Sequence, residues 1–333
     1  MEDVRSNRTV TLMAVIVMFL FSSSYIGIVI ALREIPSITM AFLRALITAV
    51  FLLILVILFW RRITGKNPRS MGLKSFIGAG AKSRYAILMV LGFAVFSNVI
   101  PNVLQNFGMN MMDPDSTSSL TSLIQGVGPV FTILLAFVVL KEKPGPWKIA
   151  GLLMAVPGIV ILTTYNEGGF DLGSEETLGA FLNLIVALSY TVSALFLKSL
   201  LNRGGSPSIA AAMNSTFGTI LLLPVLVIAA LIGLEDPFFP LTTAGLEIWM
   251  AMLFISVGIA GVTSILWYRL VKVRELSRIM FFVFMLPAFS VAMGFLVLGE
   301  NLSAMQILGG VLILIGVGVS QRRRRLRPIV TGR

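Results

Sequence analysis

Long apolar runs separated by short polar stretches recur along the whole of this chain. A helix that crosses a membrane needs about 20 mostly apolar residues, because the hydrocarbon core is about 30 Å thick and each helical residue rises about 1.5 Å. Ten runs meet this length, so the sequence predicts an all-α membrane protein with ten transmembrane helices. The predicted spans are 9–31, 38–60, 85–109, 117–140, 147–165, 178–200, 207–232, 246–270, 276–298 and 303–321.

The composition agrees with this pattern and excludes several classes of enzyme. Of 333 residues, 57% are hydrophobic and only 12% are charged, and the chain has no histidine and no cysteine. Metal-dependent membrane enzymes need histidine, cysteine or clustered carboxylates, and an intramembrane serine protease needs a base beside its serine. The chain also lacks a phosphate-binding Gly-Lys loop. The sequence therefore predicts a protein that is not an enzyme, with no metal site, no cofactor and no nucleotide-driven pumping.

The charges are placed unevenly between the two sides of the predicted membrane. With a cytoplasmic amino terminus, 24 of the 26 Lys and Arg residues fall on the inside and 11 of the 15 acidic residues fall on the outside. Basic residues favour the cytoplasmic side of membrane proteins, so both termini are predicted to be cytoplasmic. The net charge of +11 and the basic tail then indicate an anchor beside anionic lipid in the inner or plasma membrane, and no nucleic-acid partner.

An internal repeat relates the two halves of the chain. Residues 129–158 laid over 287–316 give nine identities without a gap, among them glycines at 151, 158, 309 and 316 whose seven-residue spacing predicts close helix packing. We therefore divide the chain into five-span repeats at 1–165 and 166–333. Because five is odd, the second repeat is predicted to enter the membrane from the opposite side. Such inverted repeats allow two equivalent arrangements around one midplane site, as in many secondary transporters.

Several stretches resemble a known family. PSITMAFLRALITAVFLLIL, VGPVFTILLAFVVLKE and SILWYRLVKVRELSRIMFFVFMLPAFSVAMGFLVLGENLSAMQILGGVLILIGV, together with the five-plus-five layout, are similar to EamA-type transporters of the drug/metabolite transporter superfamily. The resemblance implies a ten-helix bundle with a central cavity between the halves. It also implies export or uptake of small polar metabolites. Together with the inverted repeats, it predicts a secondary transporter of small polar metabolites such as amino acids, an exporter or exchanger that works by alternating access.

Two other functions stay open at this stage, namely a membrane channel and a flippase for lipid-linked headgroups. The predicted partners are a small-molecule substrate and membrane lipids, and the chain is either a monomer or a homodimer. No histidine or acidic residue lies well inside a predicted span, although proton-coupled carriers usually have such a relay. Facilitated diffusion or exchange is therefore favoured over proton coupling.

Amide side chains form a stripe along the third predicted span. Asn98, Asn102, Gln105 and Asn106 fall on one helix face, and Gln125 lies on the next span. A polar group within a membrane must find a partner or face a wet cavity. Two interpretations are open: hydrogen bonding between helices, or the lining of a substrate path. Asn98, Asn102, Gln105 and Gln125 are the substrate-binding candidates.

Arg44 is the one formal charge well inside a predicted span. An arginine at the centre of a membrane helix costs about 2.5–3.5 kcal/mol on the insertion scale, so it needs a reason to be there. Its side chain could extend outward to Asp113 or Asp115, or it could hold a substrate carboxylate or phosphate by paired hydrogen bonds. Related EamA sequences often read Leu-Arg at this place, whereas the second repeat has Asn214, which becomes a further binding candidate.

Four aromatic residues are candidates for the walls of the same site, namely Tyr25, Tyr190, Trp267 and Tyr268, and the first three enter the predicted substrate-binding set. Each can form an apolar wall and still donate a hydrogen bond. For Trp267, which lies near the cytoplasmic end of its span, a place in the interfacial aromatic belt is an equal alternative. Tyr25, Tyr190 and Trp267 complete the predicted substrate-binding set.

Two glutamates and two prolines occupy equivalent places in the repeats. Glu142 and Glu300 each precede a helix start, which Ser303 marks as an N-cap in the second copy. The carboxylates either fix this turn at the membrane interface or form a gating salt bridge with a basic residue. Pro129 and Pro287 lie inside predicted spans and should bend them, freeing carbonyls that a cavity or neighbour must satisfy.

Overall fold

The protein is an all-helical membrane protein in its computed structural model. Six helices are long and apolar enough to cross a membrane, and three shorter apolar helices lie at 149–162, 285–298 and 304–319. The prediction of ten spans is thus confirmed in part. The structure describes residues 2–64, 83–131, 134–135, 145–166, 169–170, 172–202, 205–273, 282–283 and 285–320.

The helices of the first half follow the predicted apolar runs, with breaks at proline and polar positions. The first break is a π-helical insertion that divides the predicted span 85–109 into three segments. The second break lies in the next predicted span, where α7 (Thr117–Gln125) stops at a turn just before Pro129. Proline clashes with the preceding helical turn, which accounts for the second break. The elements are α1 (Glu2–Leu32), α2 (Ser37–Leu58), α3 (Trp60–Thr64), α5 (Ser83–Ala94), η2 (Val95–Val99), α6 (Ile100–Asn110), α7 (Thr117–Gln125) and α9 (Pro146–Thr164).

A small hairpin lies at the boundary between the halves, where β1 (Tyr165–Asn166) pairs antiparallel with β2 (Gly169–Phe170). The second half again has a π-helical segment in its third predicted span and another at the end of its fourth. Its elements are α10 (Glu175–Asn202), α11 (Pro207–Leu231), α12 (Phe239–Thr243), α13 (Leu246–Leu253), η3 (Phe254–Thr263), α14 (Ser264–Val273), α16 (Met285–Met293), η4 (Gly294–Leu298) and α17 (Ala304–Ser320).

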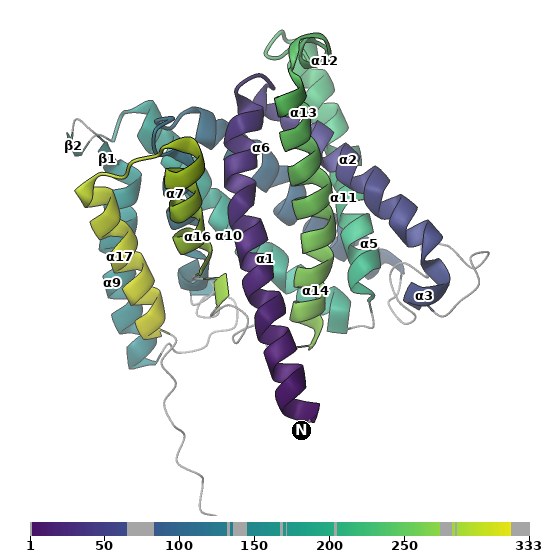
Figure 1. Cartoon of the computed structure of the whole chain (residues 1–333), viewed down its shortest axis with the longest axis horizontal. Helices are drawn as coiled ribbons and strands as arrows, with labels where there is room; N and C mark the ends of the chain where they lie inside the picture. The colour runs from purple at the N-terminus through teal and green to yellow at the C-terminus, as the bar shows by residue number, and fades with distance from the viewer. Residues whose placement is uncertain are drawn as a thin grey trace, which may run out of the picture.

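Helices α9 and α17 pack side by side at one edge of the molecule (Figure 1). A Cβ atom placed on Gly158 would lie 2.5 Å from the carbonyl oxygen of Gly309, and one on Gly316 would lie 2.6 Å from that of Gly151. The predicted close packing of these glycines is confirmed. Because Gly151 faces Gly316 and Gly158 faces Gly309, the two helices run antiparallel.

Helices α2 and α11, the second of each half, also pack antiparallel. Ile38 near the start of α2 shares a cluster with Ala229 near the end of α11, and Ala45 shares a cluster with Leu222 further along. Advancing along α2 therefore means moving back along α11. Equivalent helices of the two halves are thus antiparallel in both pairs.

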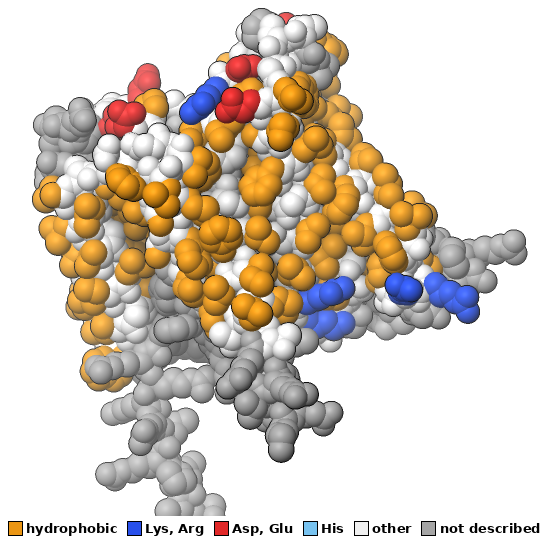
Figure 2. All heavy atoms as spheres, viewed as in Figure 1, with side chains coloured by type: hydrophobic (Ala, Val, Ile, Leu, Met, Phe, Trp, Pro, Cys, Tyr) orange, Lys and Arg blue, Asp and Glu red, His pale blue; other side chains and the backbone are white. Residues whose placement is uncertain are grey.

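Two apolar clusters leave a polar zone between them. One cluster includes Val17 of α1 and Phe93 of α5, and the other includes Ile28 of α1 and Met252 of α13. Along α1 the residues between these clusters include Ser24, which borders a cavity. On the face seen in Figure 2, an apolar band lies between an upper edge with acidic side chains and a basic side chain and a lower edge where the other basic side chains lie.

Candidate functional site

A cavity of about 390 Å³ lies at the middle of the bundle. Its described walls come from both halves. The first half contributes α1, α2, α5 with η2 and α6, and α7, and the second half contributes α10, α11, η3, α14 and α16. Neither α9 nor α17 contributes a residue to the described part of this wall. The cavity volume falls within the range of about 300–1,000 Å³ that is usual for small-molecule sites.

All nine residues predicted to bind substrate lie around this one cavity. The sequence could place them on helix faces but could not show that the faces meet. Their role in binding stays a prediction. The lining residues from that set are Tyr25, Arg44, Asn98, Asn102, Gln105, Gln125, Tyr190, Asn214 and Trp267.

A chain of hydrogen bonds links α1, α7 and α10 at one side of the cavity. The Tyr25 hydroxyl donates to Gln125 Oε1 at 3.0 Å, and Gln125 Nε2 donates to Asn183 Oδ1 at 3.1 Å. Asn183 in turn donates to the Gly179 carbonyl at 3.0 Å and is fully buried. These bonds fix the tyrosine and the glutamine, so this part of the wall is preorganised.

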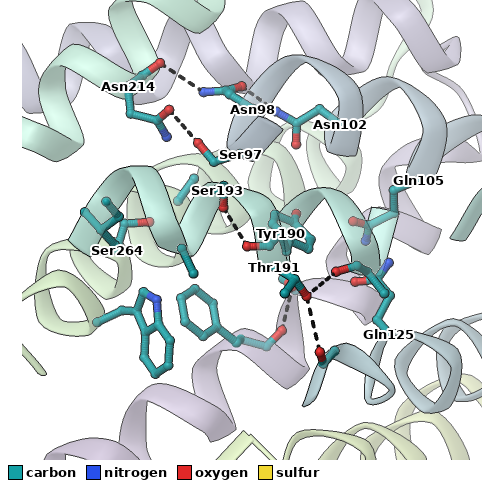
Figure 3. A pocket seen from close by; sticks show the side chains of 18 of the residues that line it. Ser97, Asn98, Asn102, Gln105, Gln125, Tyr190, Thr191, Ser193, Asn214 and Ser264 are labelled. Carbon is teal, nitrogen blue, oxygen red and sulfur yellow. Dashed lines mark hydrogen bonds between the residues drawn. The ribbon is translucent and has the colours of Figure 1, made fainter. Parts of the chain in front are cut away.

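A second polar cluster joins η2 and α6 to α11 (Figure 3). Asn102 Nδ2 donates to Asn98 Oδ1 at 2.6 Å, and Asn98 Nδ2 donates to the Asn214 carbonyl at 3.4 Å. The Ser97 hydroxyl donates to Asn214 Oδ1 at 2.6 Å, and Asn214 Nδ2 donates to the Tyr268 hydroxyl at 3.4 Å. These amides therefore connect helices and border the cavity at the same time.

Asn106, the fourth amide of the predicted stripe, differs from the other three in its position relative to the cavity. Asn106 is buried and donates to the Ser37 carbonyl at 2.9 Å, and it is not among the described lining residues. For Asn106, hydrogen bonding between helices is the role that the structure supports. Gln105 borders the cavity, and its one side-chain hydrogen bond to a described residue is a weak contact of Nε2 to the Met109 sulfur at 3.8 Å.

The π-helical segment η2 shapes the cavity wall because its wider turn shifts side chains relative to an α-helix. Such insertions are frequent at functional sites. The segment carries Ser97 and Asn98 into the polar cluster. Gly218 on α11 makes room for them, since a Cβ atom there would lie 2.5 Å from the Asn98 side chain.

Arg44 is the one charged residue among the described residues that line the cavity. It lies in the second turn of α2, close enough to Tyr25 and Tyr190 to interact with them electrostatically. Within the described chain its guanidinium has no hydrogen bond and no ion pair. Asp113, a predicted partner, instead accepts a hydrogen bond from the Asp115 backbone amide at 3.1 Å.

The aromatic candidates form an apolar part of the same wall. Trp267 packs edge to face on Phe21, with ring centroids 6.2 Å apart, and both border the cavity. The structure thus places Trp267 inside the bundle rather than in an outer aromatic belt. Tyr190 also borders the cavity and is 37% exposed.

The structure describes three of the four predicted gating and structural residues. Pro129 is a lining residue, and Pro287 lies close to Gly126, where an added Cβ would be 2.9 Å from the proline ring. Glu142 lies outside the described residues. Ser303 caps α17 as predicted, because its hydroxyl accepts from the Gln306 amide at 3.2 Å.

The structure places the Glu300 carboxylate at the start of α7 in the other half, and its predicted role in fixing the turn before α17 stays a prediction. Its carboxylate is 3% exposed and accepts from the backbone amides of Ser118 and Ser119 at 2.7 and 3.0 Å. The hydroxyls of the same serines donate to it at 2.7 and 2.5 Å. No cation pairs with Glu300 among the described residues, and the gating salt bridge stays a prediction.

The sequence reasoning missed several polar residues of the site. Asn183 is the most informative, because it is an amide within an apolar run, which is the same signal that identified Asn98. Asn183 itself is not among the described lining residues. Polar lining residues that were not predicted to bind substrate include Ser24, Thr48, Ser97, Thr191, Ser193, Ser215 and Ser264.

Comparison with known proteins gives a consistent picture. The EamA-like transporter family matches this chain twice, over residues 8–164 and 177–320. An uncharacterized transporter of Archaeoglobus fulgidus is 23% identical over 314 residues, which cover 93% of this chain and 96% of the relative. A probable amino-acid metabolite efflux pump of Escherichia coli is 22% identical over 319 residues, which cover 96% of both chains.

A Salmonella typhimurium protein also named a probable amino-acid metabolite efflux pump is 24% identical over 63% of this chain and 69% of its own. A solved crystal structure shares the fold, with a TM-score of 0.61 at 16% sequence identity. That likeness covers 94% of this chain and 96% of the other.

Proposed function

This chain belongs to the EamA-like transporter family, and from that premise we propose that it is a secondary transporter of small polar metabolites such as amino acids. Transport proceeds by alternating access, as export or exchange. The distant relatives named as probable amino-acid metabolite efflux pumps support this choice of substrate class.

The observation that carries the proposal is the central cavity whose wall is shared between the halves. Within this wall Asn98 of the first half donates to the backbone carbonyl of Asn214 of the second half, so relative motion of the halves would change the wall directly. A site built in this way can be exposed to either side in turn. The fixed amides and aromatic rings would then orient the bound solute.

We further propose that the two halves, at 1–165 and 166–333, are inverted repeats with ten spans and cytoplasmic termini. The antiparallel packing of α2 with α11 and of α9 with α17 supports the inversion, because each pair consists of equivalent helices. The excess of basic residues on one side supports the orientation.

Reconstitution distinguishes a carrier from the channel and flippase alternatives. Vesicles containing the protein and unlabelled amino acid are diluted into labelled amino acid, and uptake is followed over time. A carrier gives saturable uptake that is accelerated by solute on the far side, whereas a channel gives no acceleration. Protein-free vesicles are the control, and uptake without acceleration would contradict the proposal.

A flippase is tested in the same vesicles with a fluorescent lipid in one leaflet. We expect no faster movement between leaflets than in protein-free vesicles. Acceleration of the lipid probe together with no amino-acid counterflow would favour the flippase. A pH gradient that strongly concentrates amino acid would add proton coupling, which the absence of an acid among the described lining residues disfavours.

A further inference from the structure

Resting on the proposed transport function, we propose that the cavity selects substrates by a single carboxylate and does not require an amino group. The relevant site is the guanidinium of Arg44 and the neutral polar wall around it. This assigns a substrate class, small monocarboxylates with an apolar body, that includes but is wider than the amino acids.

The first step is the unpaired charge of Arg44. Its guanidinium borders the cavity and has no ion pair or hydrogen bond among the described residues. A buried cation is unfavourable unless an anion accompanies it. An arginine also presents two parallel donors that match the two oxygens of a carboxylate. Among the described lining residues Arg44 therefore has no protein counter-charge, and a bound carboxylate would supply one.

The second step compares the single positive charge of Arg44 with the negative charge of the anion that could bind it. No other lysine or arginine, and no aspartate or glutamate, occurs among the described lining residues. A carboxylate carries one negative charge and would neutralise Arg44 fully. A phosphate monoester carries about −1.5 to −2 at neutral pH and would leave negative charge without a partner. A dicarboxylate would do the same, so one carboxylate is the preferred anion.

The third step concerns the amino group of a zwitterion. An ammonium group is stabilised most strongly by a carboxylate. Apart from Arg44 and aliphatic side chains, the described wall offers amides, hydroxyls and aromatic rings. The amide of Gln105 and the hydroxyl of Ser264 are examples. These groups can solvate an ammonium but do not compensate its charge. Removing the amine should therefore not weaken binding, whereas removing the carboxylate should.

The rest of the wall indicates the body of the substrate. Phe21, Phe93, Tyr190 and Trp267 line the cavity together with aliphatic residues. Flat amphipathic side chains favour apolar or aromatic groups. We therefore expect the carboxylate at Arg44 and an apolar group against the aromatic rings.

The test uses the purified full chain in detergent and four probes built on phenylalanine, with a parallel series built on leucine. The probes are the amino acid, its N-acetyl form, its methyl ester and the amine without the carboxyl group. Thermal stabilisation at increasing concentration gives an apparent Kd for each. The two probes with a free carboxylate should bind at least tenfold more tightly than the ester and the amine.

Variants assign the preference to Arg44. Arg44→Gln should lose the tenfold preference, and Arg44→Lys should keep part of it, since the charge remains but the paired donors do not. Arg33→Gln is the matched control, because Arg33 lies in the turn after α1 and outside the described cavity lining, and it should bind like the parent. If Arg44→Gln fails to fold, the parent's four-probe series still tests the carboxylate preference, and Arg44→Lys still tests whether Arg44 causes it.

The inference is overturned if the ester or the amine binds as tightly as the acid, or if neither carboxylate form stabilises the parent in either series. It is also overturned if Arg44→Gln retains the preference. Counterflow of the amine or ester alone would leave the transporter standing and remove the carboxylate rule. Carboxylate-dependent stabilisation without any counterflow would support the binding site and contradict the transport function.

Discussion

At the scale of single residues, the amides of the cavity hold helices together and border the substrate space at once. Asn98 connects η2 to α11 through the Asn214 carbonyl, and Asn102 donates to Asn98 at 2.6 Å. Hydrogen bonds between membrane helices contribute about 0.6–2 kcal/mol each. The two interpretations of the amide stripe are thus compatible, because one oxygen or nitrogen of an amide can bond a neighbour while its other face stays open.

The space beside Asn98 gives a prediction at this scale. Gly218→Ala would place a Cβ atom 2.5 Å from the Asn98 side chain, which must then move. We expect a loss of stability of about 1–3 kcal/mol from overpacking and weaker solute binding. Thermal unfolding and the binding assay measure both.

Gly145→Ala is the control for this prediction, since no atom lies within 4 Å of an added Cβ there. It should unfold within about 0.5 kcal/mol of the parent. Equal stability of the two variants would show that the packing of Asn98 against α11 is not tight.

At the scale of elements, carboxylates of one half cap helix starts in the other half. Glu300 caps α7, and Glu235 after α11 accepts from the backbone amides of Ile38 and Thr39 at the start of α2. Glu34 after α1 accepts from the Gly245 amide just before α13 at 3.1 Å. The first amides of a helix lack partners within the helix, and the helix dipole favours an anion there. These three contacts join the halves at the acidic edge.

Glu300→Gln tests the most buried of these contacts. The neutral amide keeps one acceptor oxygen but loses the charge and places an NH₂ group near donors. Because a hydrogen bond to a charged group contributes about 1.5–3 kcal/mol, we expect a loss of stability of this size. Thermal unfolding of the two variants Glu300→Gln and Glu247→Gln measures the difference.

Glu247→Gln is the matched control, as Glu247 is exposed in the first turn of α13. It should change stability by no more than about 1 kcal/mol, the upper value for a surface charge near a helix dipole. If Glu300→Gln were as stable as this control, the cap on α7 would contribute nothing to the fold.

The crossing of α9 and α17 gives a second prediction at this scale. Gly309→Leu would push a side chain into a contact where an added Cβ already lies 3.1 Å from the Gly158 carbonyl oxygen. Small residues allow such close approach of membrane helices, so the larger side chain should separate them. We expect a loss of about 3 kcal/mol or more.

Gly318→Leu, on the same helix, is the control. Nothing lies within 4 Å of an added Cβ at Gly318, so its substitution should leave the unfolding temperature close to that of the parent. Because α9 and α17 do not border the described cavity, any protein that still folds with Gly309→Leu should keep its ligand preferences.

At the scale of the whole molecule, the charge bias and the proposed inversion can be tested together. The chain has no cysteine, so single cysteines can report sidedness without background. Asp236→Cys, in the loop after α11, should react with a membrane-impermeant maleimide in intact cells. Arg62→Cys, at the end of the second predicted span, should react only after permeabilisation.

A cysteine added after Arg333 should behave like Arg62→Cys, which the proposed cytoplasmic carboxyl terminus requires. Labelling of Asp236→Cys and of the added terminal cysteine from the same side would contradict the ten-span arrangement. The parent, which lacks cysteine, is the control for non-specific labelling.

Hydropathy and residue spacing were enough to predict the membrane class, most of the helix ranges and the existence of two related halves. These depend on local properties: the length of an apolar run, a proline before a break, and glycines spaced along one helix face. Asn98 and Arg44 stood out for the same reason, since a polar residue within an apolar run is visible without knowing its neighbours.

Only the tertiary structure decided which of these residues meet. The bond between Tyr25 and Gln125 joins residues 100 positions apart, and the bonds from Glu300 to Ser118 and Ser119 join residues more than 180 apart. Such pairings depend on how helices cross and rotate, and also on π-helical insertions such as η2, which shift the facing side chains. Hydropathy does not record helix rotation, so the capping role of Glu300 and the part played by Asn183 emerged only from packing.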